Sequence, residues 1–518
     1  MLNARHKTKR SLSWGQAIAP LGRPGARVES RVSEDTSVSS YGGTFIHRDT
    51  ASRGLHPLTS KEMNLQLNSY ERNVKSEFDR IKQAIEEVSK SQNETGYKHI
   101  LKDYIRNNIG IEIPEAIMTD SINDMSEVYT RKVYAWCLFE VYQHYCDSFM
   151  ANFPLAMGVD NFQSFIQECG FHTVDVSPCA DGRLAHVISY VLRLPYRSVR
   201  RKSYAGAMFD VEDTLDKWVE TELKRFREGF PNTSDAQTRY LKAVVYHFSS
   251  LYPDKEGCAA HGSNAALAAE SGKQRLDSFK QAVENTYCCG ASIDQLLIGL
   301  DTDNDTIRIH VPNEHGEINL NRYIDASEMY EATFAMTENE ARNWVMKFVD
   351  GESPQMSEGF AKLIGLLLVN NISQIDYVRT YHGDHYEDIG HAERFIGVGK
   401  GFEEVQLRNL TFFSYLRTVE ESANDLDVGV KIFTGLNINK GLPVPIVIRF
   451  DYHGNVPGSR ERAIEHCHRV NDALSTRYKE LTTQGFLYTL MIIKDVNKIT
   501  SVEKLGSSVI NQSTQEAH

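Results

Sequence analysis

The sequence lacks any run of about 18 consecutive apolar residues, so no segment is predicted to span a membrane. Its start is basic but has no apolar stretch of the kind that a secretory signal requires. It also lacks an excess of positive charge, since its formal net charge is −12, and this argues against nucleic-acid binding. Charged residues make up 24% and hydrophobic residues 41% of 518, which is typical of a soluble globular protein of several domains.

Cysteines are few and irregularly spaced for so long a chain. This predicts reduced thiols and a cytosolic setting rather than a disulfide framework. A disulfide between Cys179 and Cys258 is the alternative, and it would abolish any metal site built from those two thiols. The eight cysteines are Cys137, Cys146, Cys169, Cys179, Cys258, Cys288, Cys289 and Cys467.

The stretch Val-Asp-Val-Ser-Pro-Cys-Ala-Asp-Gly-Arg, residues 174–183, gathers three reactive side chains at alternate positions. If the backbone stays extended, Cys179, Asp181 and Arg183 share one face. A thiolate is a good zinc ligand, and a carboxylate can accept a hydrogen bond from a metal-bound water. A guanidinium can hold that carboxylate in a bidentate fork.

Two further soft ligands occur downstream of this stretch. His247 lies at the end of an apolar run that is typical of a strand, and Cys258 follows eleven residues later in a loop. Taken alone, Cys179 is more typical of a buried filler, but the combination favours a metal site. Three protein ligands leave a fourth position for water, which is the pattern of catalytic zinc.

This constellation resembles the β-type carbonic anhydrases, whose signature begins Cys-x-Asp-x-Arg and whose zinc is held by two Cys and one His. Ordinary members space the second pair as His-x2-Cys, whereas this chain has His247-x10-Cys258. The expanded loop, the long helical N-terminus and an extra C-terminal domain resemble the divergent carbonic anhydrase of α-carboxysomes, once counted as an ε class. The resemblance covers essentially everything after about residue 55.

The resemblance implies one Zn²⁺ per chain, held by Cys179, His247 and Cys258. It implies a carbonic anhydrase, a lyase that interconverts CO2 and bicarbonate and supplies CO2 to Rubisco inside the carboxysome. Hydroxide on the metal would attack CO2, and Asp181 would orient that hydroxide through a hydrogen bond. Arg183 would keep the carboxylate from becoming the fourth metal ligand. A homodimer or a higher homo-oligomer is also implied.

Turnover requires a proton acceptor, and histidine has the most suitable unperturbed pKa. His391 is the predicted acceptor, because the family's proton shuttle is sought near this domain junction. His382 and His385 belong to the same polar stretch, and His261, close to Cys258 in sequence, is the second choice. Solvated loop histidines without a role remain the alternative.

The predicted fold class is a multidomain α+β and α/β protein. Its parts are a disordered basic arm over residues 1–54, a helical N-terminal domain over 55–152, an α/β zinc domain resembling β-carbonic anhydrases over 153–397, and a C-terminal α/β domain over 398–518. The last part has no Cys-x-Asp-x-Arg. Because β-type enzymes normally pair two such domains, the resemblance implies a metal-free, degenerate duplicate there.

Apolar periodicity predicts the main elements. Helices are expected over residues 63–88, 133–153, 211–228, from about 265 to 287, and 459–481. Strands are expected over residues 240–248, 296–300, 306–311, 430–433, 444–450 and 487–494. Strands separated by helices indicate an α/β sheet with ligands at the strand ends.

Residues 1–53 contain nine Lys or Arg against four Asp or Glu and few large apolar groups. Such a segment is predicted to be disordered, since it cannot bury enough surface to offset its ordering entropy. It is either a solvated tail or a basic arm that docks on an acidic partner. The resemblance favours the arm, with Rubisco or a shell protein as the partner.

Two other charged clusters are predicted to have structural roles, without a bound ligand. Asp301-x-Asp303-x-Asp305 begins like a calcium loop but lacks its Gly and Glu, so it predicts an acidic hairpin turn. A basic cluster is predicted to be a solvated face, with binding of an anionic metabolite or of a neighbouring subunit's carboxylate as the alternative. This cluster consists of Arg197, Arg200, Arg201 and Lys202.

Two other functions compete with the enzyme predicted from the resemblance. One is an inert structural zinc site in a shell-associated scaffold, which would have no need of an Asp–Arg pair. The other is a hydrolase that uses Cys179 as nucleophile and His247 as base, without a metal.

Overall fold

The computed structural model describes residues 60–118, 126–155, 166–194, 199–233, 235–287, 292–313, 316–352, 356–400, 407–416, 423–498 and 502–510. The chain divides into two units, residues 1–52 and 53–518, and every described residue belongs to the second. The predicted arm and Arg197 lie outside the described residues. None of the described helices is long and apolar enough to cross a membrane.

The described chain opens with helices, as predicted. They are α1 (Lys61–Val88), α2 (Tyr97–Ile109), α3 (Glu115–Met118) and α4 (Ser126–Asn152). Helix α1 begins where the Ser60 side chain accepts a hydrogen bond from the Met63 amide. It is amphipathic, whereas α4 is buried on most sides, because α4 packs against α1 and also against strands near the C-terminus.

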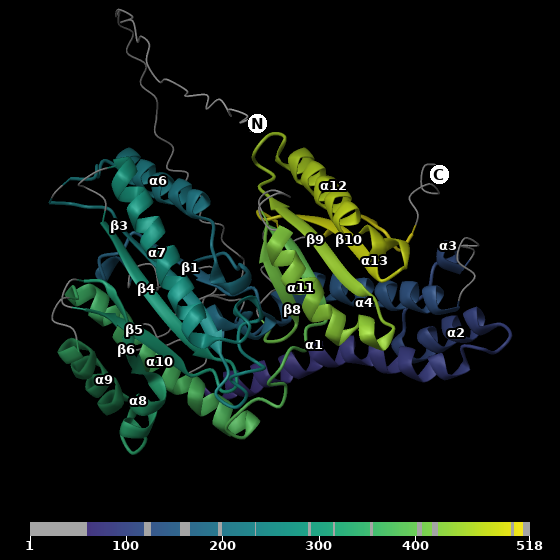
Figure 1. Cartoon of the computed structure of the whole chain (residues 1–518), viewed down its shortest axis with the longest axis horizontal. Coiled ribbons are helices and arrows are strands. Elements are labelled where there is room, and N and C mark those ends of the chain that lie inside the picture. Colours follow the sequence, from purple (N-terminus) through teal and green to yellow (C-terminus); the bar gives the residue numbers. More distant parts are fainter. Residues whose placement is uncertain are drawn as a thin grey trace, which may run out of the picture. The chain divides into compact units, whose positions relative to one another are not determined.

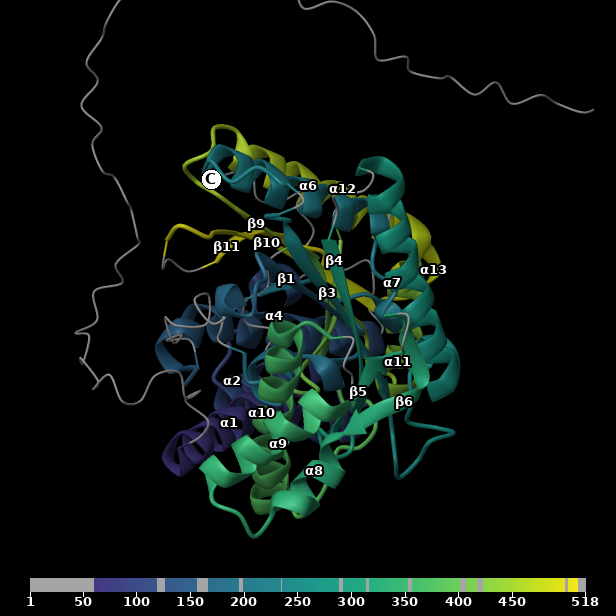
Figure 2. The same ribbon diagram turned by 90° about the vertical axis from the view of Figure 1, so that its left-hand side faces the viewer.

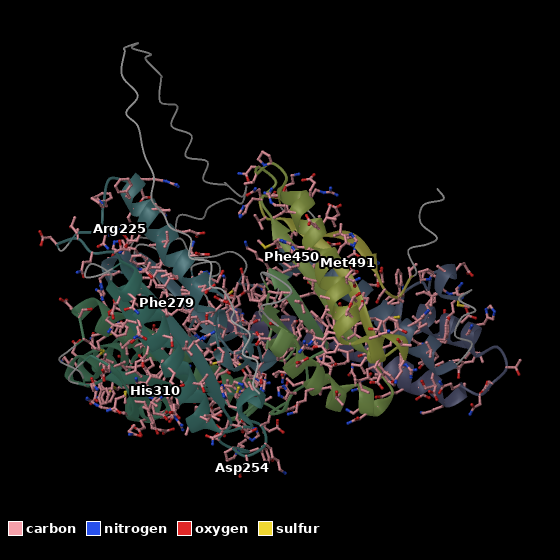
Figure 3. The ribbon with its side chains drawn as sticks, turned by 45° about the horizontal axis from the view of Figure 1, so that its top comes forward. Arg225, Asp254, Phe279, His310, Phe450 and Met491 are labelled. Atoms are coloured by element: carbon pink, nitrogen blue, oxygen red, sulfur yellow. The ribbon has the colours of Figure 1, made fainter. Side chains whose placement is uncertain are left out.

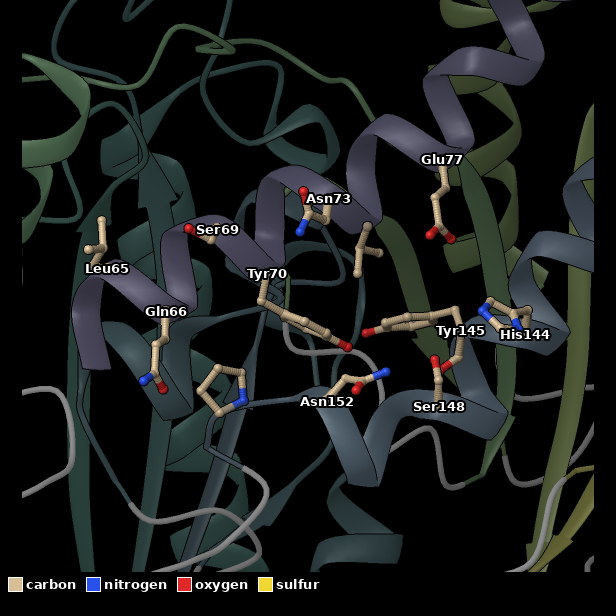
Figure 4. Close-up of a pocket in the computed structure, with 12 residues that line it drawn as sticks. Leu65, Gln66, Ser69, Tyr70, Asn73, Glu77, His144, Tyr145, Ser148 and Asn152 are labelled. Atoms are coloured by element: carbon tan, nitrogen blue, oxygen red, sulfur yellow. The ribbon is translucent and has the colours of Figure 1, made fainter. Parts of the chain in front are cut away.

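Helices α1 and α4 border a hollow of about 620 Å³ (Figure 4). Figure 4 shows Tyr70 of α1 and Tyr145 of α4 pointing toward one another across it. None of the predicted metal ligands lines this hollow.

The first sheet contains six strands in the order β2-β1-β3-β4-β5-β6. Figures 1 and 2 label all of them except β2. Strands β2, β1, β3 and β4 pair in parallel. Strand β5 pairs antiparallel with β4, and β6 pairs antiparallel with β5. Helices α6 (Val211–Arg227) and α7 (Ala265–Tyr287) connect the parallel strands, as predicted. The strands are β1 (Thr173–Pro178), β2 (Arg200–Arg201), β3 (Arg239–Phe248), β4 (Ser292–Asp301), β5 (Ile307–Pro312) and β6 (Ile318–Asp325).

Three helices that the sequence analysis did not predict follow the first sheet. They are α8 (Ala326–Thr333), α9 (Glu338–Glu352) and α10 (Glu358–His382). Helix α10 is largely buried and belongs to the hydrophobic core of the first sheet. Its apolar residues occur almost all round the helix, so it lacks the one-sided pattern that reveals a surface helix.

The second sheet contains five strands in the order β11-β10-β9-β7-β8. Figure 3 labels Phe450 and Met491, two buried side chains of its core. The strands are β7 (Phe395–Lys400), β8 (Thr411–Tyr415), β9 (Val444–Tyr452), β10 (Leu487–Asp495) and β11 (Glu503–Ser507), and the helices are α11 (Ala423–Leu436), α12 (Ser459–Arg477) and α13 (Lys479–Thr483).

The predicted strand over residues 430–433 is wrong, because these residues belong to α11. Leu426, Val430 and Phe433 are buried at spacings of four and three, which is the helical period. A stretch with three apolar residues out of four fits either structure, and packing against the sheet selected the helix.

Candidate metal centre

The signature stretch turns sharply where strand β1 ends. The strand stops at Pro178, and Gly182–Leu184 form one turn of 3₁₀ helix. Asp181 caps this turn, because its Oδ1 accepts a hydrogen bond from the Arg183 amide at 2.9 Å. The predicted extended backbone through Arg183 is therefore wrong, and the turn brings the side chains together instead.

The structure brings Cys179, His247 and Cys258 into one buried cluster. Their ligand atoms all lie within 4.8 Å of one another, and the two Sγ atoms are 3.9 Å apart. Cys179 directly follows β1, and His247 is the penultimate residue of the adjacent parallel strand β3. Their closeness follows from the topology, since the carboxyl ends of neighbouring parallel strands meet at one edge.

The donor chemistry of this cluster fits a soft divalent metal such as zinc. His247 is fully buried, and neither ring nitrogen has a hydrogen-bond partner among the described residues. Buried polar atoms are normally satisfied, so this imidazole lacks a partner of the kind a metal supplies. The hydrogen bond from Cys179 lowers the pKa of Cys258, although burial acts in the opposite direction.

Asp181 and Arg183 form a buried bidentate ion pair beside the cluster. Arg183 Nη2 donates to Asp181 Oδ2 at 2.7 Å, and Arg183 Nε donates to Oδ1 at 3.0 Å. Burial opposes ionisation of Asp181, but the charge of Arg183 holds the pKa of this carboxyl well below its usual range. The Oδ2 atom also lies 3.4 Å from His247 Nε2, so the carboxylate faces the cluster.

The expanded loop between His247 and Cys258 is held by Asp303, which the sequence analysis treated only as part of a turn. Asp303 Oδ2 accepts hydrogen bonds from the Leu251 amide at 2.7 Å and from Ser249 Oγ at 2.8 Å. The acidic turn itself is confirmed, since it joins the antiparallel strands β4 and β5. The loop in turn presents the Glu256 carbonyl to Arg183 Nη1 at 2.5 Å.

His391 is the candidate proton acceptor that the structure brings to this centre. Its Nε2 lies 3.7 Å from Asp181 Oδ2, and its Nδ1 lies 3.0 Å from Glu393 Oε1. Its side chain is 18% exposed, whereas that of Asp181 is only 3% exposed. The sequence analysis missed Glu393, although the spacing His-x-Glu beside the chosen histidine was a usable signal.

The other candidate histidines lie elsewhere. His382 packs against the rings of Tyr377 and Tyr386, and His385 Nδ1 contacts the Tyr386 carbonyl. His261 Nε2 lies 3.4 Å from the Gly206 carbonyl. Among these four histidines, only His391 pairs with Asp181.

The basic cluster is not a solvated face, contrary to the prediction. Arg200 donates to Asp175 at 2.5 Å and to Asp213 at 2.7 Å. Lys202 is buried and also pairs with Asp213, and Arg201 donates to the Ala185 carbonyl at 2.5 Å. Of the described members of the cluster, Arg200 and Lys202 thus neutralise the buried carboxylates of Asp175 and Asp213.

Family models match three successive parts of the chain. The model described as carboxysome shell carbonic anhydrase, N-terminal, matches residues 56–150, the catalytic-domain model matches residues 161–391, and the C-terminal model matches residues 392–509.

Proteins named carboxysome shell carbonic anhydrase are similar over most of their length. The one from Prochlorococcus marinus strain MIT 9313 is 47% identical, over 100% of this chain and 99% of that protein. The one from Parasynechococcus marenigrum strain WH8102 is 50% identical, over 89% of this chain and 80% of that protein. The one from Halothiobacillus neapolitanus strain ATCC 23641 is 43% identical, over 88% of this chain and 90% of that protein.

Proposed function

Because the chain belongs to the carboxysome shell carbonic anhydrase family, we propose that it interconverts CO2 and bicarbonate in the carboxysome. The observation that carries this proposal is the buried cluster of Cys179, His247 and Cys258 beside the Asp181–Arg183 ion pair. A structural zinc site has no need of such an ion pair, so the pair favours the enzyme over an inert scaffold.

We assign one Zn²⁺ to the three ligands. Two thiolates and one imidazole suit zinc, and three protein donors leave one position open. Bound zinc would lower the pKa of a water molecule in that position to about 7, which supplies hydroxide at neutral pH.

The remaining chemistry falls to the residues around the ligands. Arg183 holds Asp181 ionised. The Oδ2 atom of Asp181 can therefore accept a hydrogen bond from the O–H group that attacks CO2 and orient its oxygen toward the carbon. Arg183 donates to both carboxylate oxygens and thereby keeps Asp181 from turning into a metal ligand. His391, partly exposed and next to Asp181, carries the released proton toward solvent.

Family membership also supports a proposal for the wider role. We propose that residues 1–54 form a basic arm that docks on Rubisco or on a shell protein, and that the enzyme works inside the carboxysome, where it supplies CO2 to Rubisco. We propose at least a homodimer. We assign residues 55–152 to a helical domain, 153–397 to the zinc domain, and 398–518 to a metal-free duplicate of the β-carbonic-anhydrase fold.

The strand order of the two sheets supports the duplicate. The order β2-β1-β3-β4-β5 corresponds strand for strand to β8-β7-β9-β10-β11. In both series the first four strands are parallel and the fifth is antiparallel. Helices also occupy the same connections, with α6 and α7 in the first sheet and α11 and α12 in the second.

Metal analysis and a CO2 hydration assay on one purified sample test this function. We expect about one zinc per chain, with activity that is lost on chelation and restored by zinc. Zinc without hydration activity would identify an inert scaffold. Metal-free protein whose hydrolytic activity is destroyed by thiol alkylation would identify a Cys179 nucleophile instead.

A further inference from the structure

Glu393 is a buried carboxylate that reaches from the segment before β7 into the signature turn. It is 4% exposed, and its Oε1 accepts a hydrogen bond from the Gly182 amide at 3.0 Å. The same Oε1 lies 3.0 Å from His391 Nδ1. Its other oxygen, Oε2, has no hydrogen-bond partner among the described residues.

The turn and this carboxylate are built around each other. A Cβ atom added at Gly182 would lie 2.5 Å from Glu393 Cγ, so glycine is required between Asp181 and Arg183. The segment before β8 fixes the same turn through its backbone, since the Asn409 amide donates to the Gly182 carbonyl at 2.8 Å. Glu393 is therefore held at a set place relative to the Asp181 carboxylate.

This placement determines the tautomer of His391. A carboxylate only accepts hydrogen bonds, and Glu393 Oε1 already accepts one from a backbone N–H. The ring atom that faces Oε1 must therefore carry the proton, which makes His391 Nδ1 the donor. In the neutral ring, Nε2 is then the unprotonated nitrogen, and it faces Asp181 Oδ2 at 3.7 Å.

The charge of Glu393 also favours a protonated His391. Burial opposes the imidazolium, but Glu393 and Asp181 together raise the pKa of His391. Arg183 acts in the opposite direction, so the balance depends on the two carboxylates that flank the ring. A glutamine would satisfy Gly182 without the cost of a buried charge, so a purely structural role leaves that charge unexplained.

We propose that Glu393 is the positioning residue of the proton-transfer step, holding His391 as the Nδ1–H tautomer with Nε2 directed at Asp181. Glu393 acts through the histidine and does not touch the reacting atoms. The inference rests on the proposed carbonic anhydrase function. It adds the residue that holds His391 in the tautomer needed for proton transfer.

The substitution Glu393→Gln tests this role in the full-length holoprotein. It preserves size and an acceptor for the Gly182 amide but removes the charge. At low buffer concentration we expect kcat to fall about tenfold or more, because proton transfer is impaired, while kcat/KM stays within about twofold. Imidazole buffer should restore kcat by replacing His391. Zinc content should not change.

A second readout reports the ring directly. In ¹⁵N NMR of histidine-labelled holoprotein, His391 should show the Nδ1–H tautomer in the wild type and a mixture in Glu393→Gln. The matched control is Glu387→Gln, which changes an exposed carboxylate of the same segment. It should leave kcat, its buffer dependence and the His391 signals unchanged.

The variant His391→Asn keeps the inference testable even where Glu393→Gln fails to fold. It should show the same loss of kcat that imidazole restores, and adding Glu393→Gln to it should lower kcat no further. A wild-type enzyme without CO2 hydration would overturn the proposed function itself. If the wild type is active, full kcat at low buffer in Glu393→Gln would overturn the role of Glu393 alone. Full kcat in His391→Asn would overturn the role of His391 and, with it, that of Glu393. The same holds if kcat and kcat/KM fell together without rescue.

Discussion

The two sheets share one strand order but differ in what lies at their strand ends. In the first, the carboxyl ends of β1 and β3 carry Cys179 and His247. In the second, the corresponding strands β7 and β9 carry no group of three metal-binding side chains among the described residues. The comparison teaches that strand order supplies a rigid edge, whereas a few side chains at that edge supply the chemistry.

An arginine–aspartate pair two residues apart occurs in both sheets. Asp181 and Arg183 follow β1, and Arg449 and Asp451 lie near the end of β9, with Arg449 Nε donating to Asp451 Oδ1 at 2.6 Å. Arg449 Nη1 also lies 3.7 Å from the Cys146 sulfur of helix α4. The same kind of ion pair therefore faces the candidate metal ligands beside the first sheet and a packed helix beside the second.

The largest difference in zinc content and turnover should appear when one buried thiol is removed beside each sheet. Cys258→Ser removes a ligand, so we expect zinc to be lost and CO2 hydration to fall by at least about 1,000-fold. Cys467→Ala removes a buried thiol from α12 and should cost about 1 kcal/mol of unfolding free energy, with zinc and turnover kept. Metal analysis, hydration assays and denaturant unfolding measure these effects. Zinc loss in Cys467→Ala would contradict the expectation that only the first sheet carries a metal site.

The second contrast concerns the ion pairs. Asp181→Asn should keep zinc but lower turnover about 100-fold or more, because the neutral amide no longer orients the attacking oxygen. Asp451→Asn should keep turnover per folded molecule. Both variants remove the carboxylate charge that balances a buried arginine, so both should lose about 3 kcal/mol of unfolding free energy. Hydration assays on samples of known folded fraction separate the two, and full turnover in Asp181→Asn would remove its assigned role.

The sequence indicated the three side chains that cluster and the α/β sheet, because both leave local patterns in the chain. His247 ends an apolar strand, and parallel strands bring their carboxyl ends together. Asp303 was missed because its role depends on a contact across 52 residues of chain. Glu393 lies two residues from His391, but its contact with the Gly182 amide spans 211 residues and leaves no local pattern. The turn after Pro178 was missed because a side-chain cap at Asp181 overrode the extended pattern.

The basic cluster shows another limit of the sequence. Charges close together in sequence predict a solvated surface when nothing indicates a buried partner. Asp175 sits within a β-branched run and was counted as strand, yet it is the buried carboxylate that Arg200 and Lys242 neutralise. Only the fold shows that a carboxylate lies beneath this cluster.

The smallest expected effect concerns the segment that joins the two sheets. Asp388 pairs with Arg408, whose Nη2 donates at 2.9 Å to the Thr302 carbonyl in the turn after β4. Burial opposes ionisation of Asp388, but Arg408 and Lys75 lower its pKa from 3.8 to about 2. The folded protein therefore favours the ionised form, so this stabilisation is complete above about pH 4 and is lost as the pH falls toward 2.

Asp388→Asn should therefore lower the unfolding free energy by about 1 kcal/mol at pH 6, with the difference from wild type shrinking toward zero near pH 2. Denaturant unfolding at a series of pH values measures the difference. The control is Asp384→Asn, which changes a side chain that is 78% exposed and should leave the unfolding free energy almost unchanged. A difference between wild type and Asp388→Asn that stayed constant with pH would mean that Asp388 joins the sheets through its shape and hydrogen bonds rather than through its charge.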